Sequence, residues 1–236
     1  MRRFTIAAAV LLAATTPLAA QVGYAPEASP YREITAPTSF TATFGRFSKN
    51  GGQYGVGANN GFTYGARYAF RANKFIEISL AGTRADLERN VVDPFVPTAN
   101  RTTGPFRESM IIGEAGITAN LTGAKTWNRL APFVGIGAGA AFANRLSSAA
   151  VDTSGFRAGT RFVFTPHVGT RVFLSQRLHL RLEAKAVFWK LTYPLSFSSV
   201  PPSEPFAVPV ITNNTFREWT TNAVLQVGIG YALGIL

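Results

Sequence analysis

A strict two-residue alternation between apolar and polar side chains constrains this chain more than any other feature. It is clearest from Leu178 to Phe188, where every even position is apolar and four of the five odd positions are ionisable. Successive side chains of a strand point to opposite faces, whereas a helix would mix the two sets around its circumference. The segment is therefore predicted to be a β-strand with one apolar and one charged face.

Seven further segments alternate in the same way, which predicts an all-β chain of eight strands. The apolar residues of each segment oppose polar residues or glycines. The segments are Phe40–Gly45, Phe62–Arg71, Ile76–Leu80, Ile111–Leu121, Leu130–Phe142, Phe162–Phe173 and Asn222–Leu233. After the first twenty residues there is no run of about 18 apolar residues, which a membrane-spanning helix would need.

The connections between these segments alternate in length. Three are short, near residues 72–74, 122–129 and 175–176, and four are long, at residues 48–60, 88–105, 144–159 and 194–218. If consecutive strands run up and down, all long connections lie at one end, and an even strand number puts both termini at the other. Short periplasmic turns and long outer loops are typical of transmembrane barrels. We therefore predict an eight-stranded antiparallel up-and-down transmembrane β-barrel with long extracellular loops.

The choice of outward face separates a soluble barrel from a membrane barrel. A soluble barrel hides its apolar face inside, and a membrane barrel shows it to lipid. Here the ionisable residues lie near strand middles, and the apolar faces are rich in Phe, Leu and Ile with aromatic residues near their ends, which favours the membrane barrel. The residues expected to face lipid include Ile78, Ile117, Leu180, Leu182 and Leu225.

The first twenty residues have the pattern of a secretory signal peptide. Met1-Arg2-Arg3 is positive, Phe4–Ala14 is uncharged and mostly apolar, and Leu18-Ala19-Ala20 offers small residues before Gln21. We therefore expect residues 1–20 to be removed on export, residues 21–38 to form a flexible periplasmic leader, and residues 39–236 to form the barrel.

The chain resembles the small eight-stranded outer-membrane β-barrel proteins, the OmpA-like transmembrane domain and its relatives. The resemblance covers Ser39 to Leu233 and includes stretches such as residues 131–137 and 178–183. It implies a monomeric, porin-like or structural protein of the Gram-negative cell envelope, inserted into the outer membrane by the barrel-insertion machinery and surrounded by outer-membrane lipids. Many members end in an aromatic residue, whereas this chain ends Gly234-Ile235-Leu236. We also expect no peptidoglycan-binding domain after the last strand.

The inward faces are predicted to hold a salt-bridged polar network. Eight strands leave an interior just wide enough for side chains, and charges removed from water must be paired. The three central acids and four central bases are close to balance, which suits such a network. The predicted interior residues are Arg67, Glu77, Glu114, His167, Arg171, His179, Arg181, Glu183 and Lys185.

Register decides which of these residues meet. Inward residues are odd-numbered on both Phe162–Phe173 and Leu178–Phe188, so an odd-length turn is required, most simply one of three residues. If the residue numbers of each opposite pair sum to 350, His167 lies opposite Glu183 and Arg171 lies opposite His179. A sum of 352 sets Arg171 opposite Arg181, and we expect 350 because it avoids opposed like charges. Similar counting allows Arg67 to lie opposite Glu77 or diagonal to it.

The network is further predicted to form two layers. The lower layer would hold Arg67, Glu77, Arg171, His179 and Arg181, and the middle layer Glu114, His167, Glu183 and Lys185.

Two other functions stay open beside a structural or surface-interaction role. A barrel enzyme that modifies lipid A or phospholipid would need a rim-level site, for which Ser175, His167 and His179 are the candidates. A narrow ion or small-solute channel would need a water path past Glu114 and Lys185. Gly135-x-Gly137-x-x-Ala140 matches a dinucleotide motif only formally, because its glycines alternate within one strand. With two histidines and no cysteine, no metal or cofactor is expected.

The net charge of +11 raises the question of an anionic partner. No basic run is longer than Arg2-Arg3, which disfavours nucleic acid. The loop end is predicted to carry eleven bases and seven acids, an excess that suits lipopolysaccharide phosphates, although a solvated loop surface explains it equally well. The bases are Arg46, Lys49, Arg84, Arg89, Arg101, Arg107, Arg145, Arg157, Arg161, Lys190 and Arg217; the acids are Asp86, Glu88, Asp93, Glu108, Asp152, Glu204 and Glu218.

Overall fold

The computed structural model describes residues 28–48, 51–143 and 154–234. The chain divides into two units, residues 1–30 and 31–236, and every strand belongs to the second. The predicted signal peptide and residues 21–27 of the predicted leader lie outside the described residues. Among the described residues, no helix is long and apolar enough to cross a membrane.

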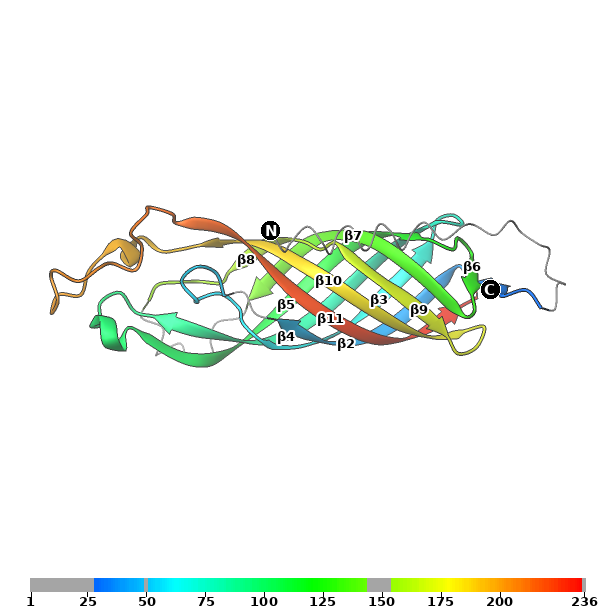
Figure 1. Ribbon diagram of the computed structural model, residues 1–236, viewed down its shortest axis with the longest axis horizontal. Coiled ribbons are helices and arrows are strands. Elements are labelled where there is room, and N and C mark those ends of the chain that lie inside the picture. Colours follow the sequence, from blue (N-terminus) through cyan, green and yellow to red (C-terminus); the bar gives the residue numbers. More distant parts are fainter. Residues whose placement is uncertain (1–27, 49–50, 144–153, 235–236) are drawn as a thin grey trace, which may run out of the picture. The chain divides into compact units, whose positions relative to one another are not determined.

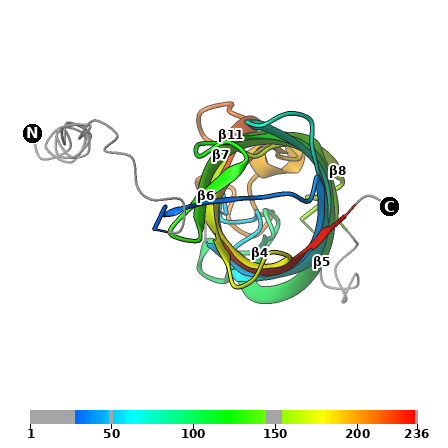
Figure 2. The same cartoon turned by 90° about the vertical axis from the view of Figure 1, so that its right-hand side faces the viewer.

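Eight antiparallel strands close into a ring (Figures 1 and 2). Each strand pairs with the next along the chain, and the last pairs with the first, so the ring leaves no open sheet edge. The ring strands are β2 (Thr38–Ser48), β3 (Gly61–Arg71), β4 (Ile76–Val92), β5 (Thr102–Asn120), β7 (Leu130–Ala143), β8 (Thr160–Phe164) together with β9 (His167–Phe173), β10 (Leu178–Thr192) and β11 (Arg217–Leu233). The predicted eight-stranded antiparallel barrel is confirmed.

β8 and β9 act as one ring strand that is interrupted at Pro166. Proline has no N–H to donate to a neighbouring strand, but its carbonyl still accepts a hydrogen bond of 3.0 Å from Ala186 N. The register continues unchanged across the break, with Phe164 opposite Phe188 and His167 opposite Lys185.

Several strands extend further toward the long connections than the alternation predicted. β4 runs to Val92 and β5 begins at Thr102, so their connection shrinks from the predicted 88–105 to 93–101. β11 begins at Arg217 rather than near Asn222. The long connections that are described lie together at one end, here called the loop end, and the short turns at the other (Figure 1). The described loops contain the short 3-10 helices η2 (Thr98–Asn100) and η3 (Leu195–Ser198).

The described part of the predicted leader forms regular structure and contacts the barrel. Its residues form β1 (Tyr31–Glu33), which pairs with β6 (Lys125–Trp127) in the segment predicted to be a plain turn. The Arg71 guanidinium then donates to the carbonyls of Ile34 and of residues 35 and 36, at 2.6, 3.1 and 3.0 Å. Figure 2 shows this segment crossing the short-turn mouth of the barrel. We call residues 31–37 the strap.

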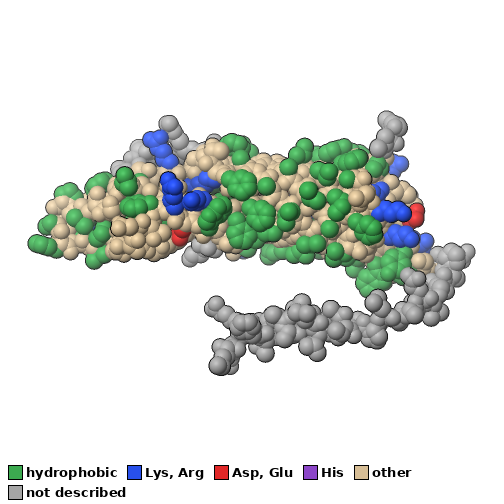
Figure 3. Space-filling model, turned by 90° about the horizontal axis from the view of Figure 1, so that it is seen from above, with side chains coloured by type: hydrophobic (Ala, Val, Ile, Leu, Met, Phe, Trp, Pro, Cys, Tyr) green, Lys and Arg blue, Asp and Glu red, His purple; other side chains and the backbone are tan. Residues whose placement is uncertain are grey.

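The outer wall is apolar. Of the five residues expected to face lipid, Ile78, Ile117, Leu182 and Leu225 are 46–67% exposed, and Leu180 is half-buried. Hydrophobic side chains cover the middle of the wall in Figure 3, whereas Lys and Arg gather toward its two ends. The same strands bury their polar residues inside. The barrel therefore has the polarity of a membrane protein.

We expect Leu182→Arg to destabilise the barrel in a lipid bilayer by about 2–4 kcal/mol, because a charge would face the hydrocarbon near its middle. Urea unfolding in liposomes, followed by tryptophan fluorescence, measures the change. Leu195→Arg is the control, since Leu195 lies 76% exposed on η3 in the fourth loop. Equal midpoints for both variants would contradict a lipid-facing Leu182.

Candidate functional site

The short-turn half of the interior holds the first part of a continuous ion-pair network. Glu77 on β4 accepts from Arg171 Nη1 on β9 at 2.7 Å and lies 4.0 Å from Arg181 Nη1 on β10. Arg181 in turn binds Glu183 through Nη2 at 2.6 Å and Nε at 2.8 Å. All four side chains are almost fully buried. Glu77 thus joins side chains from two other strands, β9 and β10.

The network continues from Glu183 toward the barrel middle. Arg67 Nη2 on β3 lies 3.2 Å from Glu183 Oε1 and 3.5 Å from Glu114 Oε1 on β5. Lys185 Nζ donates to the same Glu114 oxygen and lies 3.8 Å from Glu183. Three acids and four bases thus form one connected chain rather than two layers. Arg67, expected in the lower layer with Glu77, instead binds the two middle acids.

The expected register between β9 and β10 is wrong. The paired numbers sum to 352, so Arg171 lies opposite Arg181, His167 opposite Lys185, and His179 opposite Phe173. The turn does have three residues, 175–177, between the paired Leu174 and Leu178. The opposed arginines are tolerated because Glu77 binds both, and it comes from the far side of the ring. The sequence-based register compared only neighbouring strands, so it could not include Glu77 as a partner.

The register between β3 and β4 also differs from the expectation. Arg67 lies opposite Ala81, and Glu77 lies opposite Arg71 at the short-turn end. Arg67 therefore neither faces Glu77 nor lies diagonal to it, and its guanidinium is free to reach the middle acids.

Neutral residues complete the network, and sequence reasoning missed them. Ser79 Oγ accepts from Arg67 Nη1 at 2.9 Å, and Thr165 Oγ1 donates to Glu114 Oε2 at 3.1 Å. Asn120 Oδ1 accepts from Arg171 Nη2. The Arg181 guanidinium carbon lies 3.9 Å from the centre of the Phe133 ring, a cation–π contact. All four lie in phase with the inward charges, and that parity was the signal that could have found them.

The two histidines are packed separately against glycines. His167 lies opposite Gly135 and shares a 3.1 Å hydrogen bond with Thr118 Oγ1, and His179 lies opposite Gly230. A Cβ at either glycine would clash with the imidazole ring. Ser175 Oγ accepts from the Leu178 backbone N–H at 3.0 Å in the turn, whereas His179 is buried. The structure does not assemble these residues into a rim-level hydrolase site.

The loop-end half of the interior is built mainly of apolar side chains, which the expectation of a polar core did not include. Phe47, Trp189 and Leu191 are fully buried there, and the Phe47 and Trp189 rings stack at 5.7 Å. Side chains from the loops, such as Phe156 and Phe197, pack onto them. We call this cluster the apolar plug. It covers the network on the loop side.

Some residues that we expected on the rim point inward, among them Arg161, whose guanidinium lies 5.5 Å from the centre of the buried Phe156 ring. Arg89 and Glu108 are buried, with Arg89 Nε 3.6 Å from Glu108 Oε1. Glu218 accepts from Gln53 N at 2.7 Å and from the Tyr193 hydroxyl. Burial raises the pKa of the Tyr193 hydroxyl, and the hydrogen bond to Glu218 raises it further. Glu218 thereby ties the first loop to the base of the fourth. Lys49, Arg145 and Asp152 lie outside the described residues.

The spaces inside the network are small. One of about 20 Å³ touches Glu77 and Arg171, and one of about 10 Å³ touches Glu114 and Lys185. Each holds about one water molecule. The interior beside Glu114 and Lys185 is therefore packed, in contrast to the path that a channel would need. Within the described ranges, no three His, Asp or Glu side chains gather as metal ligands.

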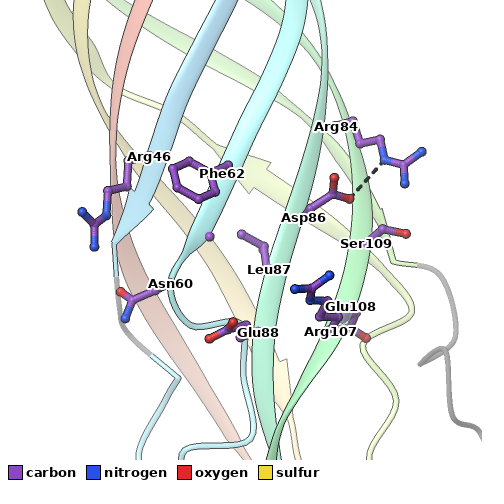
Figure 4. Close-up of a pocket in the computed structure, with 11 residues that line it drawn as sticks. Arg46, Asn60, Phe62, Arg84, Asp86, Leu87, Glu88, Arg107, Glu108 and Ser109 are labelled. Carbon is purple, nitrogen blue, oxygen red and sulfur yellow. Dashed lines mark hydrogen bonds and ion pairs between the residues drawn. The ribbon is translucent and has the colours of Figure 1, made fainter.

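The outer wall has a larger hollow near the loop end, of about 800 Å³. Figure 4 shows Arg46 on β2, Phe62 on β3, and Arg84 and Asp86 on β4 around it. Arg84 Nε binds Asp86 Oδ1 at 3.1 Å, and the Tyr64 hydroxyl donates to the other oxygen of Asp86 at 3.0 Å. Glu88 lies at the same hollow. Its bases are thus accompanied by acids.

Comparison with solved structures returns outer-membrane barrels. OprG of Pseudomonas aeruginosa is 12% identical, with 85% of this chain and 98% of that chain covered and a TM-score of 0.49. Neisserial surface protein A is 11% identical, with 87% and 98% covered and a TM-score of 0.48. Ail of Yersinia pestis, solved with the heparin analogue sucrose octasulfate, is 12% identical, with 83% and 96% covered and a TM-score of 0.35.

No family model matches the chain, and no curated protein matches it. The barrel assignment rests on the closed ring of paired strands in this chain itself.

We expect Glu183→Ala to lower the free energy of unfolding by roughly 3–5 kcal/mol, because it leaves Arg67 and Arg181 buried with fewer anions. Glu88→Ala is the matched control, since Glu88 is exposed on β4. Urea unfolding midpoints of both purified variants in the same lipid measure the difference. If the two midpoints agree, the network is hydrated and does not stabilise the barrel.

Proposed function

We propose that this chain is an outer-membrane protein with a structural or surface-interaction role, in which a packed barrel holds the loops at the cell surface. The observation that carries the proposal is the reversed polarity of the barrel: ion pairs inside and apolar side chains outside. A closed barrel satisfies every backbone hydrogen bond within lipid. In this arrangement the loop end faces outward, and the strap and short turns face the periplasm.

The filled interior supports a structural role over conduction. The strap crosses one mouth, the ion-pair network fills the middle, and the apolar plug occupies the loop half. A side chain in each of the three layers would have to move before a solute could pass. The barrel is thus a packed support for the loops at its outer end.

The loops support a role in surface interaction. The second and fourth loops are held together, because Glu204 accepts from Thr98 N at 3.1 Å and Arg101 donates to Val208 O at 3.1 Å. Beyond these contacts Phe206 is fully exposed and Leu195 is 76% exposed. Ordered loops with exposed apolar tips are suited to contact another molecule.

The chain contains no cysteine, so single introduced cysteines can test this topology. We expect Phe206→Cys to react with a membrane-impermeant maleimide on intact cells. Arg177→Cys, in a short turn, should react only after the outer membrane is permeabilised. Leu182→Cys should stay unlabelled in both conditions because it faces lipid.

Membrane fractionation and heat-modifiable gel migration check that each variant is a folded barrel. Labelling of Arg177→Cys on intact cells would reverse the proposed orientation. Labelling of Leu182→Cys, or a barrel found in the soluble fraction, would rule out the membrane assignment.

A further inference from the structure

A second hollow on the outer wall lies at the loop end between β8, β10 and β11, with a volume of about 520 Å³. Lys190 and Trp219 face each other across β10 and β11. Phe162 on β8 lines the opposite side. Arg157 and Arg161 also line the hollow, but the Arg161 guanidinium turns inward to the Phe156 ring. Arg217 is exposed two pairs further along, opposite Thr192. The hollow therefore combines bases with two large aromatic side chains, and we call it the basic hollow.

In the described part of the chain, Lys190 and Arg157 have no acid beside them. None of its lining residues is an acid, and no carboxylate among the described residues lies within ion-pair distance of Lys190 or Arg157. The hollow in Figure 4 differs, because Arg84 is bound to Asp86 and Glu88 lies nearby. Two sites at the same end of the barrel thus carry different net charges. The basic hollow is the one that attracts an anion.

The backbone beside the hollow is held by Arg161. Its Nη2 donates to the Arg157 carbonyl at 3.4 Å, and its guanidinium lies 5.5 Å from the centre of the buried Phe156 ring. Arg161 thereby positions the segment that carries Arg157. The side chains of Arg157 and Lys190 are exposed and available to a ligand.

The position of the hollow selects the kind of anion. Phe162 and Trp219 are 59% and 60% exposed, and the apolar wall continues below them through Phe164 and Leu225. Aromatic residues at this level are typical of a membrane–water interface. A ligand that fills the hollow has an apolar part against the wall and an anionic part at the bases. A free polyanion would match the charge but leave the apolar wall unused.

We propose that the basic hollow binds the phosphate group of an anionic lipid in the outer leaflet, with Lys190 and Arg157 as the phosphate ligands. Ammonium and guanidinium groups form charge-assisted hydrogen bonds with phosphate oxygens. Trp219 and Phe162 would pack on the first part of the acyl chains. The inference rests on the proposed outer-membrane location and adds the lipid chemistry that the outer wall recognises.

The test uses the full-length barrel in nanodiscs that contain either bis-phosphorylated lipid A or its dephosphorylated form. The readout is the temperature at which the compact gel species is lost. We expect phosphorylated lipid A to raise this temperature for the unmodified barrel. The double variant Lys190→Gln/Arg157→Gln should lose most of that rise and bind phosphorylated lipid A about tenfold more weakly.

The matched control is Arg46→Gln/Arg84→Gln, which removes the same charge from the hollow in Figure 4 and should keep the rise. If both variants lose the temperature rise equally, the effect depends on net charge alone and the proposed site is overturned. No difference between the two lipids for the unmodified barrel would overturn it as well. Saturable binding of sucrose octasulfate in detergent, lost only in the Lys190/Arg157 variant, would assign the site to a free polyanion instead.

Failure of the lipid site can be distinguished from failure of the proposed function. If cysteine labelling shows a spanning barrel while phosphorylation of lipid A has no effect, only the lipid site fails. If labelling shows no membrane insertion, the proposed function fails whatever the hollow binds.

Discussion

The cost of burying charge inside a narrow barrel is the constraint on which the rest of the structure depends. An ionised side chain removed from water is unfavourable by several kcal/mol unless it is paired. Here each of the three central carboxylates contacts at least two bases, and these groups come from β3, β4, β5, β9 and β10. The ion pairs therefore cross the barrel and join strands that share no backbone hydrogen bonds. A shift in register would leave several of these charges without partners.

The remaining interior is arranged around this network. Glycines at 135 and 230 make room for the two histidines, and the two spaces described beside the ionic groups are each about the size of one water molecule. Toward the loops the same inward faces become mainly apolar, and the stacked rings of Trp189 and Phe47 cover the network on that side. At the other mouth Arg71 holds the strap through three carbonyls. Burial of these side chains strengthens each ion pair, because charges are screened less in the interior than in water.

The outer wall is not uniform around the ring. At the loop end, one hollow places acids beside its arginines, and the other presents Lys190 and Arg157 with aromatic side chains and no lining acid. Both lie above a common apolar wall. The difference comes from which residues occupy the outward positions of the strand ends, where packing imposes few requirements. Such positions can be adapted to a partner without any change in the barrel core.

The sequence by itself determined the number of ring strands, the face to which each side chain points and the alternation of short and long connections. These depend on local geometry, because the two-residue period is a property of the extended backbone. Only the tertiary structure decided the register of β9 and β10, in which Arg171 faces Arg181. That pairing depends on Glu77, about a hundred residues away in sequence and brought close by closure of the ring. The apolar plug and the strap were decided in the same way, since both join segments whose proximity no local pattern encodes.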